Sequence, residues 1–370
     1  IDSSYDGRIR LAQELRDTTN DVAATATRPS GFARVGTELW AFQGRDVYSW
    51  DFTNANWDKG TVPSATNRIH RNGVEFGSRT FAPAWLTADH TPARFIYKAD
   101  ADADWTLGAA GSGTQVQGVK FMAKARNIAN ADIMWGAYII RADATYGNNR
   151  IVSTTDPTTI GTWSSEVAIG ESDSEITNLL TGDDNQLLIF KTNGIYTYQV
   201  SGPDSPFSAI VINRTPEFQD SPNADNFRVA YNWNGRILTT VAPNQLMELV
   251  LTPDATGGRY TRRMISLKHV LPRLTTLHNP IVAICGTVEY VFLLVFDSAN
   301  LTYYLLKGEL AEFDGVLDYR WHYVANVVYT TSTDEDEAAL FVDGLTGASE
   351  VHHRLLLGVF NGGTATPPYY

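Results

Sequence analysis

A short pattern that recurs three times constrains the fold of this chain more than any other feature. Each copy is a β-rich run followed by an acidic turn and a tryptophan, and the three tryptophans are Trp57, Trp105 and Trp163. Trp105 lies 48 residues after Trp57, and Trp163 lies 58 residues after Trp105. A strand-rich unit that recurs about every 50 residues is typical of a repeat architecture and favours a β-propeller.

The pattern continues beyond Trp163 with more varied aromatic residues. Phe207, Tyr260 and Trp321 each follow a strand-like run at a comparable interval. With the three tryptophans they make six anchors of a structural repeat, and residues 322–370 leave room for one more unit. The sequence therefore predicts an all-β propeller of six or seven four-stranded blades.

Turn signals divide the rest of the chain into short strands without a helical period. Asn193-Gly194 and Asn234-Gly235 are typical two-residue hairpin turns. We expect the propeller to span residues 31–360, after an N-terminal extension or linker at 1–30 and before a C-terminal linker or following segment at 361–370. The clearest expected strands are 38–42, 47–52, 95–98, 186–191, 195–200, 227–233, 236–241, 246–251, 288–296, 301–307 and 338–342.

Composition excludes several classes of protein. The net charge of −12 argues against a surface that reads nucleic-acid phosphates or an anionic membrane. The longest apolar stretch, 290–296, is far shorter than the ~20 residues that span a bilayer. Cys285 is the only cysteine, so no intrachain disulfide can form.

The third copy of the pattern resembles the Asp-box of sialidase-like propellers, whose order is Ser-x-Asp-x-Gly-x-Thr-Trp. Ser153, Asp156, Gly161, Thr162 and Trp163 keep that order, with extra residues on either side of Asp156. The resemblance implies a structural hairpin in which the aspartate binds turn amides, the glycine is left-handed and the tryptophan packs between blades. It implies a propeller and is no evidence for sialidase activity.

Candidate chemistry is sparse. Asp100, Asp102 and Asp104 alternate and can converge on calcium, but Trp105 and Gly111 occupy the places where an EF-hand needs glycine and an acid, so a solvated acidic turn is favoured. The seven histidines show no metal-ligand spacing, and no Gly-x-Ser-x-Gly motif is present. The adjacent Arg262 and Arg263 are expected to diverge on a strand. We predict no catalytic, cofactor-binding or metal-binding residue, and hence no enzyme.

A second resemblance points to bacteriophages. Residues 175–198 contain Ile-Thr-x-Leu, a short turn, Leu-x-Ile-Phe-Lys and then Gly-Ile-Tyr, and this segment is similar to a passage in phage virion proteins. The resemblance implies a surface strand, a turn and the central strand pair of one blade. It also implies a virion location and a structural role in a tail or neck, as a nozzle, tube or fibre-attachment protein.

The expected partners follow from that reading. Other virion proteins and copies of the chain itself are expected to dock at blade edges and loops. Contacts with DNA or host surface glycans would be transient, and no membrane is expected as a partner. The alternative function is a carbohydrate-binding or glycan-hydrolysing propeller of the sialidase-like class, and a third is a bacterial surface adhesion or scaffold module.

Overall fold

The computed structural model describes the central part of the chain with short gaps. No described segment is a helix, so none offers a helical span long and apolar enough to cross a membrane. The described residues are 29–51, 53, 56–61, 63, 67–69, 71–86, 92–126, 131–182, 186–199, 210–213, 229–242, 245–252, 259–267, 269–271, 281–297, 300, 302–313, 315–328, 339–346 and 351–358. The predicted terminal segments 1–30 and 361–370 therefore lie almost wholly outside them.

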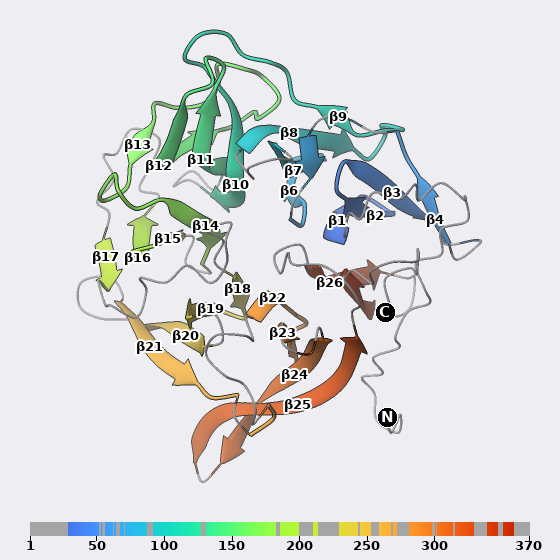
Figure 1. Ribbon diagram of the computed structural model, residues 1–370, viewed down its shortest axis with the longest axis vertical. Coiled ribbons are helices and arrows are strands. Elements are labelled where there is room, and N and C mark those ends of the chain that lie inside the picture. Colours follow the sequence, from blue (N-terminus) through green and yellow to red (C-terminus); the bar gives the residue numbers. More distant parts are fainter. Residues whose placement is uncertain are drawn as a thin grey trace.

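Seven antiparallel sheets stand around a ring in the order of the sequence (Figure 1). The strands of blades 1 to 3 are β1 (Pro29–Val35), β2 (Glu38–Gln43), β3 (Asp46–Asp51) and β4 (Asn56–Lys59); β5 (Asn67–Ile69), β6 (Val74–Phe76), β7 (Arg79–Leu86), β8 (Pro92–Ala99) and β9 (Thr106–Leu107); and β10 (Val116–Arg126), β11 (Asp132–Arg141), β12 (Tyr146–Thr154) and β13 (Val167–Ala168).

The strands of blades 4 to 6 are β14 (Ile176–Thr181), β15 (Gln186–Lys191), β16 (Gly194–Gln199) and β17 (Ile210–Asn213); β18 (Ala230–Trp233), β19 (Arg236–Ala242), β20 (Gln245–Thr252) and β21 (Arg259–Ile265); and β22 (Ile281–Gly286), β23 (Val291–Asp297), β24 (Thr302–Phe313) and β25 (Val316–Val328). The seventh sheet contains β26 (Ala339–Thr346) and β27 (Val351–Gly358). The predicted all-β propeller is confirmed: the described strands form six four-stranded blades when the split inner strand of blade 2, β5 and β6, is counted once.

Each blade is a meander whose first strand lies nearest the centre of the ring. The inner strands β10, β14, β18, β22, β26 and β1 contact one another in sequence, so β26 closes the ring between β22 and β1. In blade 2 the inner strand is split, because β5 and β6 both pair with β7. The resemblance of residues 175–198 implied that its first strand lies at the surface, and this is wrong. That strand, β14, is the inner strand of blade 4, and its Ile176 and Leu179 are buried.

Local sequence explains the hairpins. Asn234 and Gly235 join β18 to β19, and both have positive φ (51° and 81°), as a type I′ turn requires. The strand β15 has the predicted bounds 186–191. Strand β24 instead runs six residues beyond its predicted end at residue 307, because β25 continues to pair with it.

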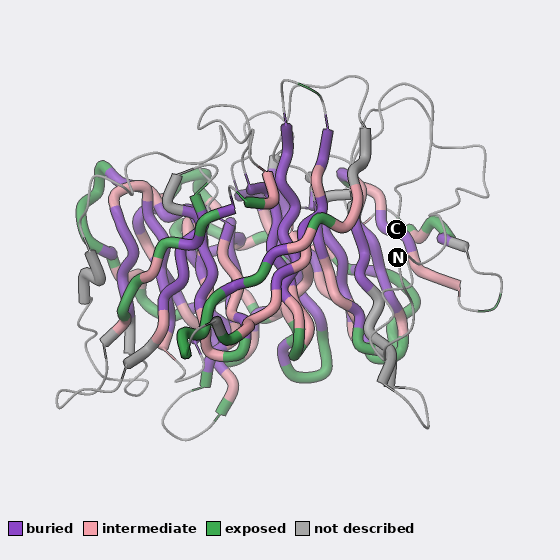
Figure 2. The backbone as a smooth tube through the Cα atoms, turned by 90° about the horizontal axis from the view of Figure 1, so that it is seen from below, coloured by how far each residue is buried: buried purple, intermediate pink, exposed green. Residues whose placement is uncertain are grey.

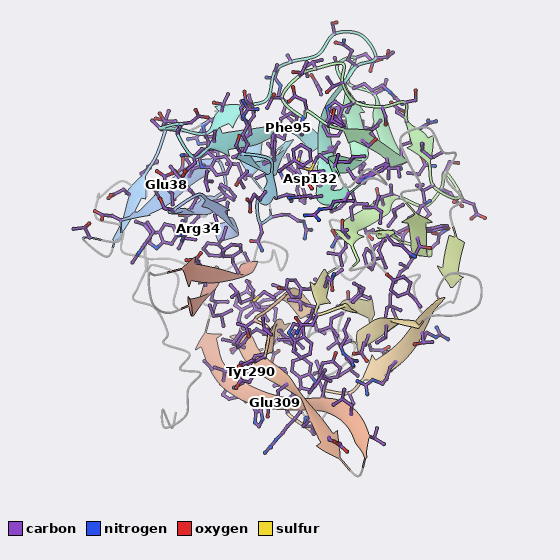
Figure 3. All side chains as sticks on the ribbon, turned by 180° about the vertical axis from the view of Figure 1, so that it is seen from behind. Arg34, Glu38, Phe95, Asp132, Tyr290 and Glu309 are labelled. Carbon is purple, nitrogen blue, oxygen red and sulfur yellow. The ribbon has the colours of Figure 1, made fainter. Side chains whose placement is uncertain are left out.

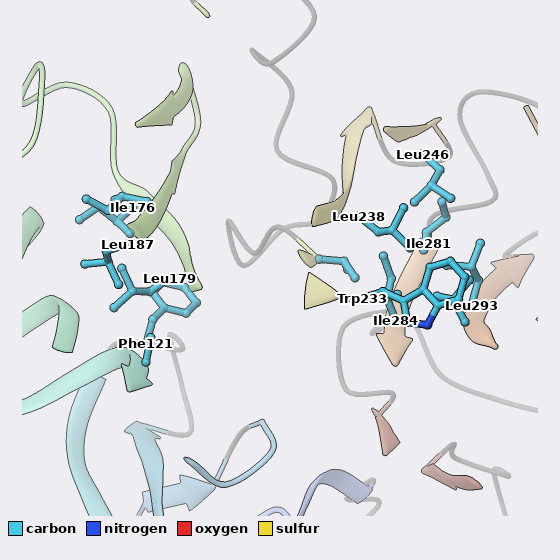
Figure 4. Close-up of a cluster of buried hydrophobic side chains, with 14 of the residues drawn as sticks. Phe121, Ile176, Leu179, Leu187, Trp233, Leu238, Leu246, Ile281, Ile284 and Leu293 are labelled. Carbon is cyan, nitrogen blue, oxygen red and sulfur yellow. The ribbon is translucent and has the colours of Figure 1, made fainter. Parts of the chain in front are cut away.

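The core lies between the blades rather than inside any one of them. Buried residues colour the middle of the strands and exposed residues the turns (Figure 2). The largest cluster runs through blades 3 to 6 and includes Phe121, Leu187, Trp233 and Leu293 (Figure 4). Because both faces of a blade are covered, a strand such as β23 reads as one apolar run and is buried along its whole length.

Polar contacts reinforce the closure of the ring. Asn72, between β5 and β6, accepts a hydrogen bond from the Phe32 amide of β1 and donates to the Leu340 carbonyl of β26, both at 3.0 Å. Arg34 of β1 donates to both carboxylate oxygens of the buried Asp343 of β26 at 3.1 Å. Figure 3 shows Arg34 beside the seventh sheet. Blades 1 and 2 and the seventh sheet are thus bonded together.

We predict that Asn72→Ala lowers the free energy of unfolding by about 1–3 kcal/mol, because two backbone groups lose their partner. Urea unfolding of the purified chain measures the change. The variant Asn72→Asp keeps the acceptor for Phe32 but sets a carboxylate oxygen against the Leu340 carbonyl, so it should be no more stable than Asn72→Ala. Equal stability of all three proteins would show that Asn72 does not help to close the ring.

Candidate functional site

The repeat anchors mark the outer strand of their blades. Trp57 lies in β4 and Trp321 in β25, Trp105 directly precedes β9, and Trp163 lies four residues before β13. Tyr260 lies in β21 and is half-buried. Phe207 lies outside the described residues.

The four tryptophan anchors are buried in clusters that lie between blades. Trp105 of blade 2 meets Phe42 of blade 1 edge to face, with 5.1 Å between the ring centroids. Trp163 of blade 3 lies in one cluster with Phe81 and Phe95 of blade 2. Edge-to-face aromatic pairs at such distances stabilise the fold by more than the burial of their apolar area alone. The four tryptophan anchors therefore have a packing role.

The turn before Trp163 is held by its own side chains. The carboxylate of Asp156 accepts hydrogen bonds from the amide and hydroxyl of Thr158 and from the hydroxyl of Thr159. These donors hold the pKa of Asp156 below its usual range. Gly161 has a φ of 93°, which favours glycine. The turn is therefore held together by hydrogen bonds among its own residues.

The acidic turn at residues 100–104 does not gather its carboxylates. Asp102 accepts the amide of Ala99 at 3.0 Å, whereas Asp104 accepts the amide of Thr61 at 3.4 Å. The carboxyl of Asp100 packs against Gly36 of blade 1. Among the described residues, no group of three or more His, Cys, Asp or Glu is placed to hold a metal ion.

The feature that departs from a regular propeller is an arm on blade 6. Strands β24 and β25 have 12 and 13 residues, but β23 accompanies β24 only from Thr302 to Gly308. Residues 309–313 and 316–320 therefore continue as a two-stranded ribbon, which we call the arm. The arm projects from the ring (Figure 1), and Glu309, labelled in Figure 3, lies at its start.

A buried ionic cluster, which we call the clasp, holds the arm against blade 5. The hydroxyl of Tyr319 on the arm donates to Glu248 Oε1 at 2.6 Å. Arg236 donates to the same oxygen at 2.7 Å, and Arg263 donates to Oε2 at 2.9 Å. Glu248 is only 2% exposed, so its charge depends on these charge-assisted bonds. The ring of Tyr319 also packs against Trp233 of blade 5.

The clasp contains the residue types of a glycosidase, but its electrostatics are those of a structural contact. Burial, together with the hydrogen bond to the Glu248 carboxylate, raises the pKa of Tyr319 far above its ordinary value. A nucleophilic tyrosine needs a lowered pKa or a base that removes its proton. Glu248 is placed as such a base, but the raised pKa leaves the proton on Tyr319. The geometry of the clasp therefore fits a mechanical role that fixes the arm.

The backbone of the arm is also bonded to side chains. Arg263 donates to the carbonyl of Leu317 at 2.8 Å, and the amide of Tyr319 donates to the Asp318 carboxylate at 2.7 Å. A strand edge covered in this way is a poor template for another strand. The side chains of the arm, among them the exposed Val316 and Leu317, are thus its accessible feature.

Sequence reasoning did not single out the arm or the clasp. Arg262 and Arg263 were expected to diverge, and the structure places Arg263 in the clasp while Arg262 is exposed. The available signal was Glu248 inside the apolar run 246–251, because a carboxylate on a buried strand needs a partner. The partners Arg236 and Tyr319 come from other strands, and the second from another blade.

Comparison with known proteins supports the propeller fold and carries no further information. No model of a known protein family matches the chain, and no curated protein matches its sequence. Sqt1 from Chaetomium thermophilum is 9% identical, with 92% of this chain and 97% of that one covered and a TM-score of 0.51. YCF48 from Cyanidioschyzon merolae is 9% identical, with 95% and 99% covered and a TM-score of 0.50. At such identities the likeness is one of fold, and no function is carried over.

We predict that Trp163→Ala costs about 3–5 kcal/mol of stability, because a large ring between two blades leaves a cavity. Chemical denaturation measures the loss. Trp50→Ala, at a half-buried tryptophan, is the matched control and should cost less. An unchanged midpoint for Trp163→Ala would contradict a packing role.

A second prediction concerns alkaline pH. The unfolded chain releases the Tyr319 proton near pH 10, whereas the folded chain keeps it. The free energy of unfolding should therefore fall as pH rises above about 10, and Tyr319→Phe should fall less steeply. Urea unfolding at a series of alkaline pH values measures both slopes, with the exposed Tyr146→Phe as control. Parallel slopes for wild type and Tyr319→Phe would rule out the clasp as the cause.

Proposed function

We propose that the chain is a non-enzymatic structural subunit of a bacteriophage tail or neck, of the nozzle, tube or fibre-attachment type. In this proposal the propeller is a platform that binds other virion proteins and copies of itself. The arm is its principal docking element, and the clasp holds the arm in place before a partner arrives. A preorganised element loses less conformational freedom on binding.

The platform proposal rests on where exposed apolar side chains gather. Val316, Leu317 and Tyr323 are all exposed and all belong to β25, with Val316 62% exposed at the tip of the arm. The other large apolar side chains exposed among the described residues are Tyr146, Met264 and Val288. Apolar groups concentrated on a projecting element are typical of a protein-binding surface.

The virion part of the proposal is supported by sequence. The segment 175–198, which resembles phage virion proteins, forms β14, β15 and β16 of blade 4. It thus corresponds to the three inner strands of that blade and leaves out the outer strand β17. The net charge of −12 also suits a protein near a DNA channel, because like charges keep DNA from adhering.

The sugar-binding alternative has less support in the described residues. Aromatic rings that bind sugars must be accessible, but eight of the nine tryptophans are buried and Trp50 is half-buried. A sialidase-like site would also need arginine and tyrosine side chains near a carboxylate. In the clasp, side chains of these types are hydrogen-bonded to Glu248. We therefore retain glycan binding as the outcome that would replace the virion proposal.

The arm is tested with the double substitution Val316→Asp and Leu317→Asp. Both side chains are exposed, so the variant should fold with an unchanged melting temperature and lose association with its partner or with itself. Tyr146→Asp, at a tyrosine that is 42% exposed on strand β12 of blade 3, is the matched control and should associate normally. Analytical ultracentrifugation and co-purification measure the effect, and equal association of both variants would remove the arm from the proposal.

The virion location needs its own measurement. Mass spectrometry of purified phage particles should detect this chain at a fixed ratio to other tail proteins. A glycan array probed with the purified chain should remain unlabelled. Absence of the chain from particles, together with binding to one class of glycan, would overturn the structural role.

A further inference from the structure

An asparagine followed by a glycine lies where the ring closes. Asn72-Gly73 connects β5 to β6, and β6 contacts β1, which in turn contacts β26 (Figure 1). Asparagine is a thermally labile residue, and a following glycine leaves the backbone nitrogen uncrowded because it has no Cβ atom. An Asn-Gly dipeptide is thus especially prone to lose its side-chain amide as ammonia.

This loss is an intramolecular substitution. Hydroxide takes the amide proton of Gly73, whose nitrogen then forms a bond to Cγ of Asn72. The bond from Cγ to Nδ2 breaks, and the leaving nitrogen takes a proton from water, so that ammonia departs and hydroxide is restored. Water then opens the resulting succinimide ring at either carbonyl, which gives aspartate or isoaspartate. The reaction therefore needs a backbone nitrogen that can lose its proton and a carboxamide that can turn toward it.

In the closed ring, hydrogen bonds restrain both reacting groups. The amide of Gly73 donates to the carbonyl of Phe32 on β1 at 2.8 Å. Oδ1 of Asn72 accepts from the Phe32 amide, and Nδ2 donates to the carbonyl of Leu340 on β26. A nitrogen whose proton is engaged is harder to deprotonate, and a carboxamide bonded through both of its polar atoms loses partners when it rotates.

Packing around Gly73 adds a second restraint. A Cβ atom on this residue would lie 2.7 Å from Cβ of Ala33 on β1 and 2.7 Å from Cγ2 of Thr80 on β7. The attack requires Gly73 to move relative to Asn72, and these neighbours leave little space for that movement. The preceding Arg71 has a φ of 76°, a conformation that is strained for a residue other than glycine. The segment is thus held in a strained conformation by its neighbours, and their separation would let it relax.

We propose that Asn72 is a deamidation site that the closed ring protects and that an opening between β1 and β26 exposes. Such a local opening breaks the bonds to Phe32 and Leu340 and removes the packing on Gly73. The products oppose reclosure. Aspartate sets a carboxylate oxygen against the Leu340 carbonyl, and isoaspartate adds one carbon atom to the backbone. A ring that opens for long enough is therefore modified irreversibly at the position that closes it.

The test measures the deamidation rate at each asparagine by peptide mass spectrometry after incubation in mildly alkaline buffer. In wild type, Asn72 should react many-fold more slowly in the folded chain than in guanidinium. Arg34→Ala removes the bond to Asp343 of β26 and should accelerate the reaction at Asn72 several-fold. The exposed Asn234, in the Asn-Gly turn of blade 5, is the internal reference and should keep its rate. Tyr319→Phe, at the clasp, is the matched control and should leave Asn72 at the wild-type rate.

Two results would overturn protection by ring closure. Asn72 could react equally fast in folded and unfolded wild type, or Arg34→Ala could fail to accelerate Asn72 more than Asn234. If Arg34→Ala does not fold, wild type in guanidinium below its unfolding midpoint replaces it, because the rate at a protected site follows the population of the open state. Asn72 should then accelerate before Asn234, and a simultaneous rise at both sites would assign the reaction to global unfolding.

The effect of the product on closure has its own measurement. Wild type in which Asn72 has been converted should unfold at a lower urea concentration than fresh protein. Asn234→Asp is the reference for a charge of the same sign placed at an exposed turn, and it should shift the midpoint less. An unchanged midpoint after conversion of Asn72 would show that the modification does not oppose closure.

Discussion

Closure of the ring is the constraint on which the rest of the structure depends. Every blade buries both of its faces against its neighbours, so a blade at an open end would leave one apolar face in water. The bonds of Arg34 to Asp343 and of Asn72 to Phe32 and Leu340 lie at the junction where the chain's first and last sheets meet. Hydrogen bonds are directional, so these polar groups fix how the sheets are oriented at this junction. Apolar packing is not directional and cannot do this alone.

The radial geometry of the ring explains where large and small residues occur. Sheets converge toward the centre and spread apart toward the rim. Gly31 on the inner strand β1 lies so close to Arg71 that a Cβ atom would sit 2.0 Å from its carbonyl oxygen. At the outer strands the gap is wider, and Trp57, Trp105 and Trp163 fill it. The spacing of tryptophans along the sequence thus reflects the wedge shape between successive blades.

This relation also explains how far sequence reasoning could go. The repeat of tryptophans and the hairpin dipeptide Asn234-Gly235 are local signals, and they predicted the fold class and many of the strands. The position of β14 at the centre was not predictable, because burial of an inner strand is decided by neighbouring blades. The clasp escaped for the same reason. Glu248 and Tyr319 are 71 residues apart, and only their meeting between two blades gives either one a role.

The clasp couples the position of the arm to the core of blade 5. Glu248 is buried, and its charge is tolerated only while Tyr319, Arg236 and Arg263 supply hydrogen bonds. An arm that swung away would take Tyr319 with it and leave the carboxylate short of one donor. The arm is therefore held rigid by the cost of exposing or unpairing a buried charge. A rigid projection with apolar side chains at its tip suits a subunit that must repeat one geometry in every copy of an assembly.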